Sequence, residues 1–268
     1  MTKSFVASEV ASYFDSADLF AAVDRLDGEV YRQVENRRTI RVTLGERDYF
    51  AKIHQGVGWG EIFKNLFQFR LPVLGARNEW QAIQCLTAAD VRTMTAVLFC
   101  ERGLNPAAQR SAILTQSLGN RVSLEDYVPE SVPMKRRLIH EVADMSRKMH
   151  AAGVNHRDFY LCHFLMGQTD RDQPELYLID LHRAQIRSRV PERWLVKDLG
   201  GLLFSAFDKS LTRRDLLRFI RVYRPGGLRE ALTTDRKFWL KVIARARRLY
   251  LQDHETVPVQ IDRLLATV

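Results

Sequence analysis

Hydrophobic and polar residues alternate along three short stretches early in the chain, which is typical of half-buried β-strands. These stretches are residues 29–34, 39–44 and 49–53, and short polar segments separate them. Links of this kind suit antiparallel hairpins. Two further apolar stretches, 93–101 and 112–117, predict two more strands. We therefore expect a five-stranded antiparallel sheet in the first part of the chain.

The second half of the chain replaces this alternation with apolar residues at three- and four-residue steps, which predicts amphipathic helices. The clearest cases are residues 133–150, 212–223 and 235–252. We expect an α+β fold with two lobes. A small antiparallel-sheet lobe covers residues 1–117, and a mostly helical lobe covers residues 118–268.

Residues 59–71 combine aromatic and aliphatic side chains with lysine and arginine at helical spacing. Two interpretations stay open for this amphipathic segment. Its apolar face packs on the predicted sheet, or it contacts a membrane surface or a protein partner. A second helix is expected over residues 78–88.

The C-terminal part of the chain carries an excess of positive charge. The chain of 268 residues has a formal net charge of +9. Residues 211–248 contain twelve Arg or Lys against three Asp or Glu, so this region holds the whole excess. A solvated helix face is one interpretation. The other is an anionic partner: nucleic acid, lipid headgroups or an acidic glycan. No nucleic-acid-binding motif is present, so we expect no nucleic acid.

The sequence also bears on location. No run of 18 apolar residues predicts a transmembrane helix, and the first residues lack the pattern of a secretory signal. Three unclustered cysteines favour reduced thiols rather than a disulfide framework. We expect a cytoplasmic protein.

The strongest chemical signal is the triplet His156-Arg157-Asp158, followed by the apolar stretch 176–179 and then Asp180. An HRD triplet with a second aspartate after a strand is the pattern of a protein-kinase-like phosphotransferase. Asp158 would meet the acceptor hydroxyl, and Asp180 would hold the Mg²⁺ that neutralises the ATP phosphates. His163 stands where such kinases carry an asparagine metal ligand. Either it hydrogen-bonds Asp158 and a metal-bound water, or a second metal ion is weakly held.

The upstream parts of a kinase are also recognisable. Lys52 lies on the third predicted strand, where a lysine grips ATP phosphates, and Glu79 is the best-placed partner for it. Glu61 is the rival. The loop between the first two strands has no glycine, so Arg37 and Arg38 are candidates to supply phosphate-binding charge instead.

Further candidates come from the segments that join the lobes. Gln116 and Leu118 lie where a kinase hinge offers backbone groups to adenine. After Asp180 the chain lacks a peptide-docking segment, which favours a small-molecule or glycan acceptor. Arg183, Arg187 and Arg189 follow Asp180 and could bind acceptor anions, although solvated surface arginines are an equal account of each.

Two other chemistries fit less well. A zinc or iron site could in principle use five residues of this region: His156, Cys162, His163, Asp180 and His182. That site would leave Lys52 and the early hairpins unexplained. A serine hydrolase is also disfavoured, since no GxSxG elbow is present.

With these residues in place, the chain resembles the lipopolysaccharide core heptose kinases of the protein-kinase-like superfamily over nearly its whole length. The motifs that carry the resemblance are RRT (37–39), YFAKIH (49–54), LPVLGA (71–76), SLEDY (123–127), MHAAGVNHRDFYLCHF (149–164), IDLHRAQ (179–185), VPERW (190–194) and KDL (197–199). HRDFYLCHF is the most specific, because it places histidine at 163.

The resemblance implies ATP- and Mg²⁺-dependent phosphorylation of an inner-core heptose on the lipid A-linked oligosaccharide. It implies a peripheral position on the cytoplasmic face of the inner membrane, with Asp158 as base and Asp180 as metal ligand. A kinase of another sugar or of protein tyrosine remains an alternative. So does a catalytically weak kinase-like binding module, which the glycine-free loop and His163 would suit.

Overall fold

The computed structural model describes residues 2–15, 18–34, 36–67, 75–167, 174–257 and 262. By its contacts the chain divides into two compact units. Unit 1 comprises Met1–Gln84, Met94–Gly119 and Leu181–Arg183, and unit 2 comprises Cys85–Thr93, Asn120–Asp180 and Ala184–Val268.

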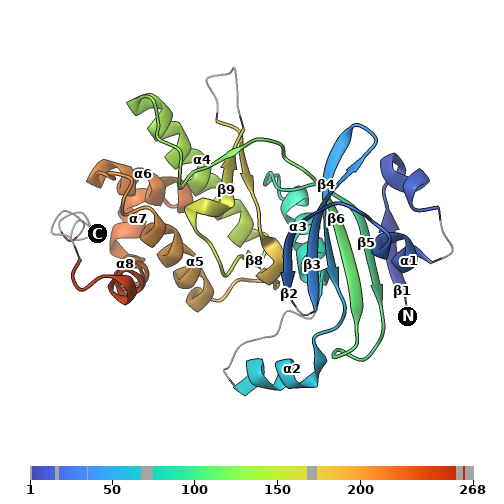
Figure 1. Ribbon diagram of the computed structural model, residues 1–268. Helices are drawn as coiled ribbons and strands as arrows, with labels where there is room; N and C mark the ends of the chain where they lie inside the picture. The colour runs from blue at the N-terminus through green and yellow to red at the C-terminus, as the bar shows by residue number, and fades with distance from the viewer. Residues whose placement is uncertain are drawn as a thin grey trace. The chain divides into compact units, whose positions relative to one another are not determined.

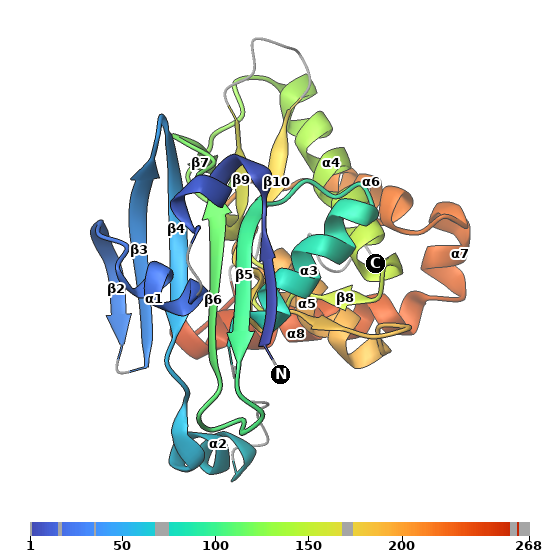
Figure 2. The same cartoon turned by 90° about the vertical axis from the view of Figure 1, so that its right-hand side faces the viewer.

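Unit 1 is built on a six-stranded sheet in which every neighbouring pair is antiparallel, with the order β1-β5-β6-β4-β3-β2 (Figures 1 and 2). Its strands are β1 (Thr2–Val6), β2 (Glu29–Val34), β3 (Arg37–Leu44), β4 (Arg47–His54), β5 (Ala96–Arg102) and β6 (Arg110–Gln116). The five predicted strands are confirmed. The prediction missed β1, a five-residue edge strand that pairs with β5.

Alternation along β4 decides which side chains face which layer. Ala51 and Ile53 are buried in a core with Phe20 and Val23 of α1 (Leu19–Asp24). Successive side chains of a strand point to opposite faces, so Lys52 points away from this core. Figure 1 shows α1 and α3 (Arg77–Ala88) on opposite faces of the sheet, and Lys52 therefore faces α3.

Helix α2 (Gly58–Phe67) corresponds to the predicted amphipathic segment, whose residues 68–71 lie outside the described part of the chain. Ile62 is 6% exposed, but Trp59 is 51%, Phe63 52% and Phe67 84% exposed. Among the side chains of α2 that the structure describes, Ile62 is buried and the three aromatic ones lie at the surface. Ile62 fits the packing interpretation, and the aromatic side chains are available to a membrane surface or a partner.

Unit 2 is mainly helical. Its helices are α4 (Val132–Ala151), α5 (Glu192–Ser205), α6 (Arg213–Tyr223), α7 (Gly227–Thr233) and α8 (Arg236–Asp253). The three predicted helices are confirmed, and α7 was missed because it follows Pro225 and Gly226. Among the described residues, no helix combines the length and the apolar character needed to cross a membrane.

Short strands of unit 2 flank the HRD segment, which follows α4. They form a three-stranded sheet, β10 (Leu176–Leu178), β9 (Phe164–Met166) and β7 (Val122–Ser123), and a pair, β11 (Gln185–Ile186) with β8 (Val154–Asn155). Gly153 joins α4 to β8 with φ +79°, and a Cβ there would lie 1.8 Å from the Arg187 carbonyl oxygen. Only glycine fits this turn.

Candidate functional site

The lysine of β4 is held by a buried carboxylate. Lys52 Nζ lies 2.6 Å from Glu79 Oε1, and the Glu79 side chain is 1% exposed. Glu79 lies in the first turn of α3 on the Lys52 face of the sheet. Its second oxygen, Oε2, has no hydrogen-bond partner among the described residues. The pair fixes the direction of the lysine side chain.

The two arginines predicted near the nucleotide phosphates lie on opposite faces of the sheet. In the β3–β4 register Arg37 is opposite His54 and Arg38 is opposite Ile53. Cross-strand partners share a face, so Arg37 is on the Lys52 side and Arg38 is on the side of the apolar core. The structure thus brings only Arg37 to the face of Lys52.

His54 adds no charge to this face. Its pKa is lowered to about 3, mainly by burial and further by Arg37, Lys52 and His182. The imidazole is therefore neutral near pH 7, and the positive charge on this face comes from Lys52 and Arg37.

The predicted hinge residues lie at the end of β6. The Gln116 backbone N–H already donates to the Thr95 carbonyl oxygen at 2.8 Å. That donor is used inside unit 1, so a base could use only other groups of Gln116. Leu118 lies just beyond the strand and is partly buried.

The backbone of the HRD segment is held by Asp198 of α5, which is 1% exposed. The His156 N–H donates to Asp198 Oδ2 at 2.7 Å and the Arg157 N–H donates to Oδ1 at 2.9 Å. Arg157 has φ +77°, a conformation that costs a non-glycine residue about 1–2 kcal/mol. Through these two hydrogen bonds Asp198 holds the loop.

Two histidines brace Asp198 and the loop. His150 Nε2 lies 3.3 Å from Asp198 Oδ2, and its Nδ1 lies 2.9 Å from the Tyr223 hydroxyl. His156 is fully buried, and Nε2 donates to the Ile179 carbonyl oxygen at 2.9 Å. Burial lowers the pKa of His156, so its ring is neutral. It braces the loop.

His163 links the two aspartates of the proposed chemistry. Its Nδ1 lies 2.6 Å from the Asp158 backbone oxygen, and its Nε2 lies 3.5 Å from Asp180 Oδ2. A carbonyl can only accept, so Nδ1 carries the hydrogen. Nε2 is then the ring nitrogen that faces the Asp180 carboxylate.

This donor set fits Mg²⁺ better than zinc. Asp180 offers the carboxylate oxygen that a hard cation prefers, and its side chain is 33% exposed. No cluster of three or more His, Cys, Asp and Glu able to hold a metal occurs in the part of the chain that the structure describes. The described residues therefore give no support to the alternative zinc or iron site.

The three arginines after Asp180 have different surroundings. Arg183 belongs to the 3-10 turn η3 (Leu181–Arg183) of unit 1, and Arg189 is exposed. Arg187 is partly buried in unit 2, where it donates to Asn155 Oδ1 and, at 2.6 Å, to Gln185 Oε1.

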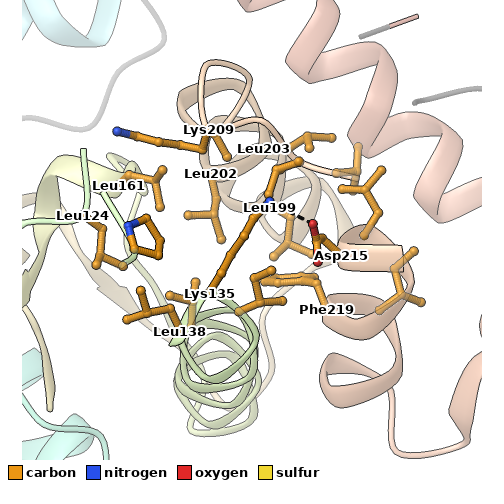
Figure 3. A pocket seen from close by; sticks show the side chains of 18 of the residues that line it. Leu124, Lys135, Leu138, Leu161, Leu199, Leu202, Leu203, Lys209, Asp215 and Phe219 are labelled. Carbon is orange, nitrogen blue, oxygen red and sulfur yellow. Dashed lines mark ion pairs between the residues drawn. The ribbon is translucent and has the colours of Figure 1, made fainter. Parts of the chain in front are cut away.

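An apolar cavity of about 160 Å³ in unit 2 has no counterpart in the sequence prediction (Figure 3). It lies among α4, α5, α6 and α8, and its lining includes Leu124, Leu138, Leu161, Leu199, Leu202, Leu203, Phe219 and Trp239. Lys135 and Asp215 form an ion pair of 3.0 Å at its wall. Its lining comes from several segments, mainly from ordinary core positions of four helices, so no sequence motif marks it.

Comparison with known proteins supports the kinase interpretation. The family model described as "Lipopolysaccharide kinase (Kdo/WaaP) family" matches residues 21–223. Lipopolysaccharide core heptose(I) kinase WaaP of Pseudomonas aeruginosa is 50% identical over 247 residues, covering 88% of this chain and 92% of the relative. The Escherichia coli K12 protein of the same name is 46% identical, covering 90% and 94%.

A solved structure, "WaaP in complex with acyl carrier protein", has a TM-score of 0.80 and 42% identity. It covers 92% of this chain and 99% of the solved chain. This likeness extends the match from sequence to fold.

Proposed function

The chain belongs to the lipopolysaccharide kinase (Kdo/WaaP) family, and from that premise we propose that it transfers the γ-phosphoryl group of ATP to a hydroxyl of an inner-core heptose. It is an enzyme, a kinase of the lipopolysaccharide core that phosphorylates a sugar hydroxyl. The observation that carries the finer proposal is the loop fixed by Asp198, in which His163 joins Asp158 to Asp180.

In this proposal each residue has one task. Asp158 accepts the proton of the acceptor hydroxyl, a role that supplies about 10²–10⁴ in rate. Lys52, directed by Glu79, binds ATP phosphate oxygens, and Arg37 adds charge on the same face of the sheet. Asp180 would hold Mg²⁺. When bound, the ion offsets the negative charge of the phosphates.

His163 acts on the position of both acids. Its hydrogen bond from Nδ1 to the Asp158 backbone oxygen fixes the ring, and the other ring nitrogen, Nε2, faces the Asp180 carboxylate. We assign it to hold a water in the metal's coordination shell rather than to bind the metal directly, since imidazole is a poor Mg²⁺ ligand.

The test is ATP consumption with purified core glycolipid, compared with free sugars and tyrosine peptides. We expect phosphorylation of the glycolipid alone, and phosphorus NMR of the product identifies the heptose and its hydroxyl. Faster turnover of another sugar or a peptide would replace the heptose proposal. ATP binding without any turnover would favour the kinase-like binding module.

We also propose that α2 contacts the cytoplasmic surface of the inner membrane, where a lipid-linked acceptor is available. Trp59 and Phe63 stack at 5.8 Å and are both half exposed, as amphipathic membrane-surface helices require. Gly58 N donates to the Ala107 oxygen at 2.9 Å, which fixes the helix to a loop that exposes Leu104 at 84%. The net charge of +9 favours anionic lipid.

Replacing both Phe63 and Phe67 by serine is expected to lower the fraction of protein that floats with phosphatidylglycerol vesicles at least fivefold. The reason is the loss of apolar area that the interface would bury. A double Val128→Ser/Leu251→Ser variant removes exposed apolar side chains elsewhere and should float normally. Unaltered flotation of the Phe63/Phe67 variant would contradict the membrane contact and favour a protein partner for α2.

We further propose that the chain associates with an acyl carrier protein, as the WaaP of the solved complex does. The apolar cavity of unit 2 supports this, because a cavity of this size lined by leucine and phenylalanine excludes water and takes up apolar groups. In this proposal the cavity holds the acyl chain carried by the partner.

Replacing Leu203 by tryptophan, which fills part of the cavity, is expected to weaken binding of acylated carrier protein at least tenfold. Leu251→Trp places the same side chain on the exposed part of α8 and should bind normally. Calorimetry with acylated and non-acylated carrier protein measures the difference. Equal affinity for the two forms would show that the acyl chain does not enter the cavity.

A further inference from the structure

Four cationic side chains surround one indole ring beside the HRD segment. Their charged atoms lie 4.4 Å (Lys197), 5.4 Å (Arg193), 5.5 Å (Arg187) and 5.7 Å (Arg157) from the centroid of the Trp194 ring. All belong to unit 2. An indole has two faces, and a cation–π contact stabilises one cation at each. Four cations within 5.7 Å exceed what the ring can compensate.

A fifth cation, Arg245 of α8, joins this group. Its side chain crosses Gly200 of α5, where an added Cβ would lie 2.5 Å from Arg245 Cγ. The glycine therefore lets Arg245 lie against α5, one turn from Lys197. Together with Trp194 these five cations are called the Trp194 cluster: Arg157, Arg187, Arg193, Lys197 and Arg245.

No carboxylate neutralises most of the cluster. Within the described residues, none lies within ion-pair distance of Arg187, Arg193, Lys197 or Arg245. Burial lowers the pKa of Lys197, the nearby Arg245, Arg157 and Arg193 lower it further, and Asp198 offsets these effects only in part. The pKa of Arg187 is lowered by burial and by Arg193. These side chains repel one another in the structure as it stands.

Three buried donors in or beside the cluster lack an acceptor within the described ranges. They are Trp194 Nε1, Arg245 Nε and Asn155 Nδ2, and the Asn155 side chain is fully buried and bonded to Arg187 through its oxygen. A buried donor without a partner costs about 1–3 kcal/mol. Each of these three groups is an N–H, so a ligand that offers acceptor oxygens would satisfy them.

Helix α5 adds to the same potential. Arg193 lies in its first turn, where the helix dipole is positive and acidic residues are normally favoured, and Lys197 follows one turn later. Glu192, the acidic residue of that turn, forms an ion pair with Lys241 of α8 at 2.6 Å. Arg193 and Lys197 are also exposed, so a ligand can reach them.

We propose that the Trp194 cluster is a binding site for an anionic group, a phosphate or a carboxylate, on the acceptor of the kinase reaction. This rests on the proposed function, since the acceptor is a lipopolysaccharide core that carries lipid phosphates and acidic sugars. Arginine forks and a lysine match the oxygens of either group. Because Arg157 directly precedes Asp158, an anion held here fixes the acceptor beside the proposed base.

The test replaces the two exposed cations, which touch no proposed catalytic group. Arg193→Gln/Lys197→Gln is expected to raise the KM for core glycolipid at least tenfold, with kcat and the KM for ATP within about twofold of wild type. Arg213→Gln/Arg214→Gln makes the same charge change at exposed positions of α6 and should leave every constant unchanged. Matched unfolding midpoints confirm that both variants fold.

Altered acceptors identify the anion. If the anion is a phosphate, removing the phosphates from the glycolipid raises its KM for the wild-type enzyme as much as the cluster substitutions do, and raises the KM of the cluster variant no further. If the anion is a carboxylate, reducing the carboxyl groups of the glycolipid has these two effects. An unchanged KM in the cluster variant, or an equal rise in the α6 variant, overturns the proposal.

A binding measurement separates this site from the reaction. Fluorescence titration of labelled core glycolipid without ATP should show weaker binding by the cluster variant. If the cluster variant binds the glycolipid more weakly but the wild-type enzyme does not phosphorylate it, the proposed function is wrong and the proposed binding site is supported. If phosphatase treatment of the enzyme itself reproduces the rise of KM, the cluster binds a phosphorylated residue of the protein, which overturns the acceptor assignment.

Discussion

Replacing Asp158 by asparagine is expected to lower kcat for core glycolipid by a factor of about 10²–10⁴, the usual contribution of a positioned general base. The amide has the shape of the carboxylate but cannot accept the hydroxyl proton. The loop around it should not move, because Asp198 holds the backbone of His156 and Arg157 independently of the Asp158 side chain. KM values and the unfolding midpoint should therefore stay near those of wild type. Steady-state kinetics and thermal unfolding measure these quantities.

Two companion variants make the Asp158 result specific. Asp180→Asn should also abolish most turnover but shift the Mg²⁺ concentration at half-maximal rate upward, whereas Asp158→Asn should leave that concentration unchanged. Asp208→Asn changes an exposed aspartate of unit 2 and should leave both turnover and the Mg²⁺ concentration at half-maximal rate unchanged. Full turnover by Asp158→Asn would exclude Asp158 as the base.

Local periodicity was enough to predict the larger elements. Strands β2 to β4 were found by alternation and β5 and β6, which are buried along most of their length, as continuous apolar stretches. Helices α4, α6 and α8 repeat apolar residues every three or four positions. Edge strand β1 was not predictable in this way. Phe5 is 42% exposed, and β1 owes its place to backbone pairing with β5 rather than to a buried face.

Spacing also located the residues that lie close along the chain. His156, Asp158 and His163 occupy one short loop, and their order follows the kinase pattern. The opposite directions of Arg37 and Arg38 follow from strand alternation, which the prediction did not apply to them. The use of the Gln116 amide by Thr95 depends on a neighbouring segment and has no local signal.

The Trp194 cluster shows why tertiary sites escape a sequence pattern. Its cations come from the HRD loop, the segment after β11, helix α5 and helix α8. Each looks like an ordinary surface arginine or lysine in its own segment. Only Arg187 was singled out, because it follows Asp180. Packing of α8 over Gly200 brings Arg245 to the others, and no spacing encodes that contact.

Replacing Asp198 by leucine is expected to destabilise the protein by about 3–5 kcal/mol and to lower kcat in the fraction that stays folded. The carboxylate accepts from the His156 and Arg157 N–H groups and lies 3.3 Å from His150, so leucine leaves these buried groups unpaired. Arg157 would also lose the contact that holds it at positive φ, and Asp158 would lose its fixed direction.

Asp198→Asn separates the two effects. The amide keeps the size and one acceptor oxygen but turns an NH₂ toward one of the two loop N–H groups, so we expect a smaller loss of stability together with a clear loss of kcat. Chemical denaturation gives the free energy of unfolding, and kinetics well below the new midpoint give kcat. Tyr223→Phe is the matched control, because it removes a hydroxyl that reaches Asp198 only through His150. If Asp198→Asn is destabilised but turns over at the wild-type rate, the loop does not need this anchor to place Asp158.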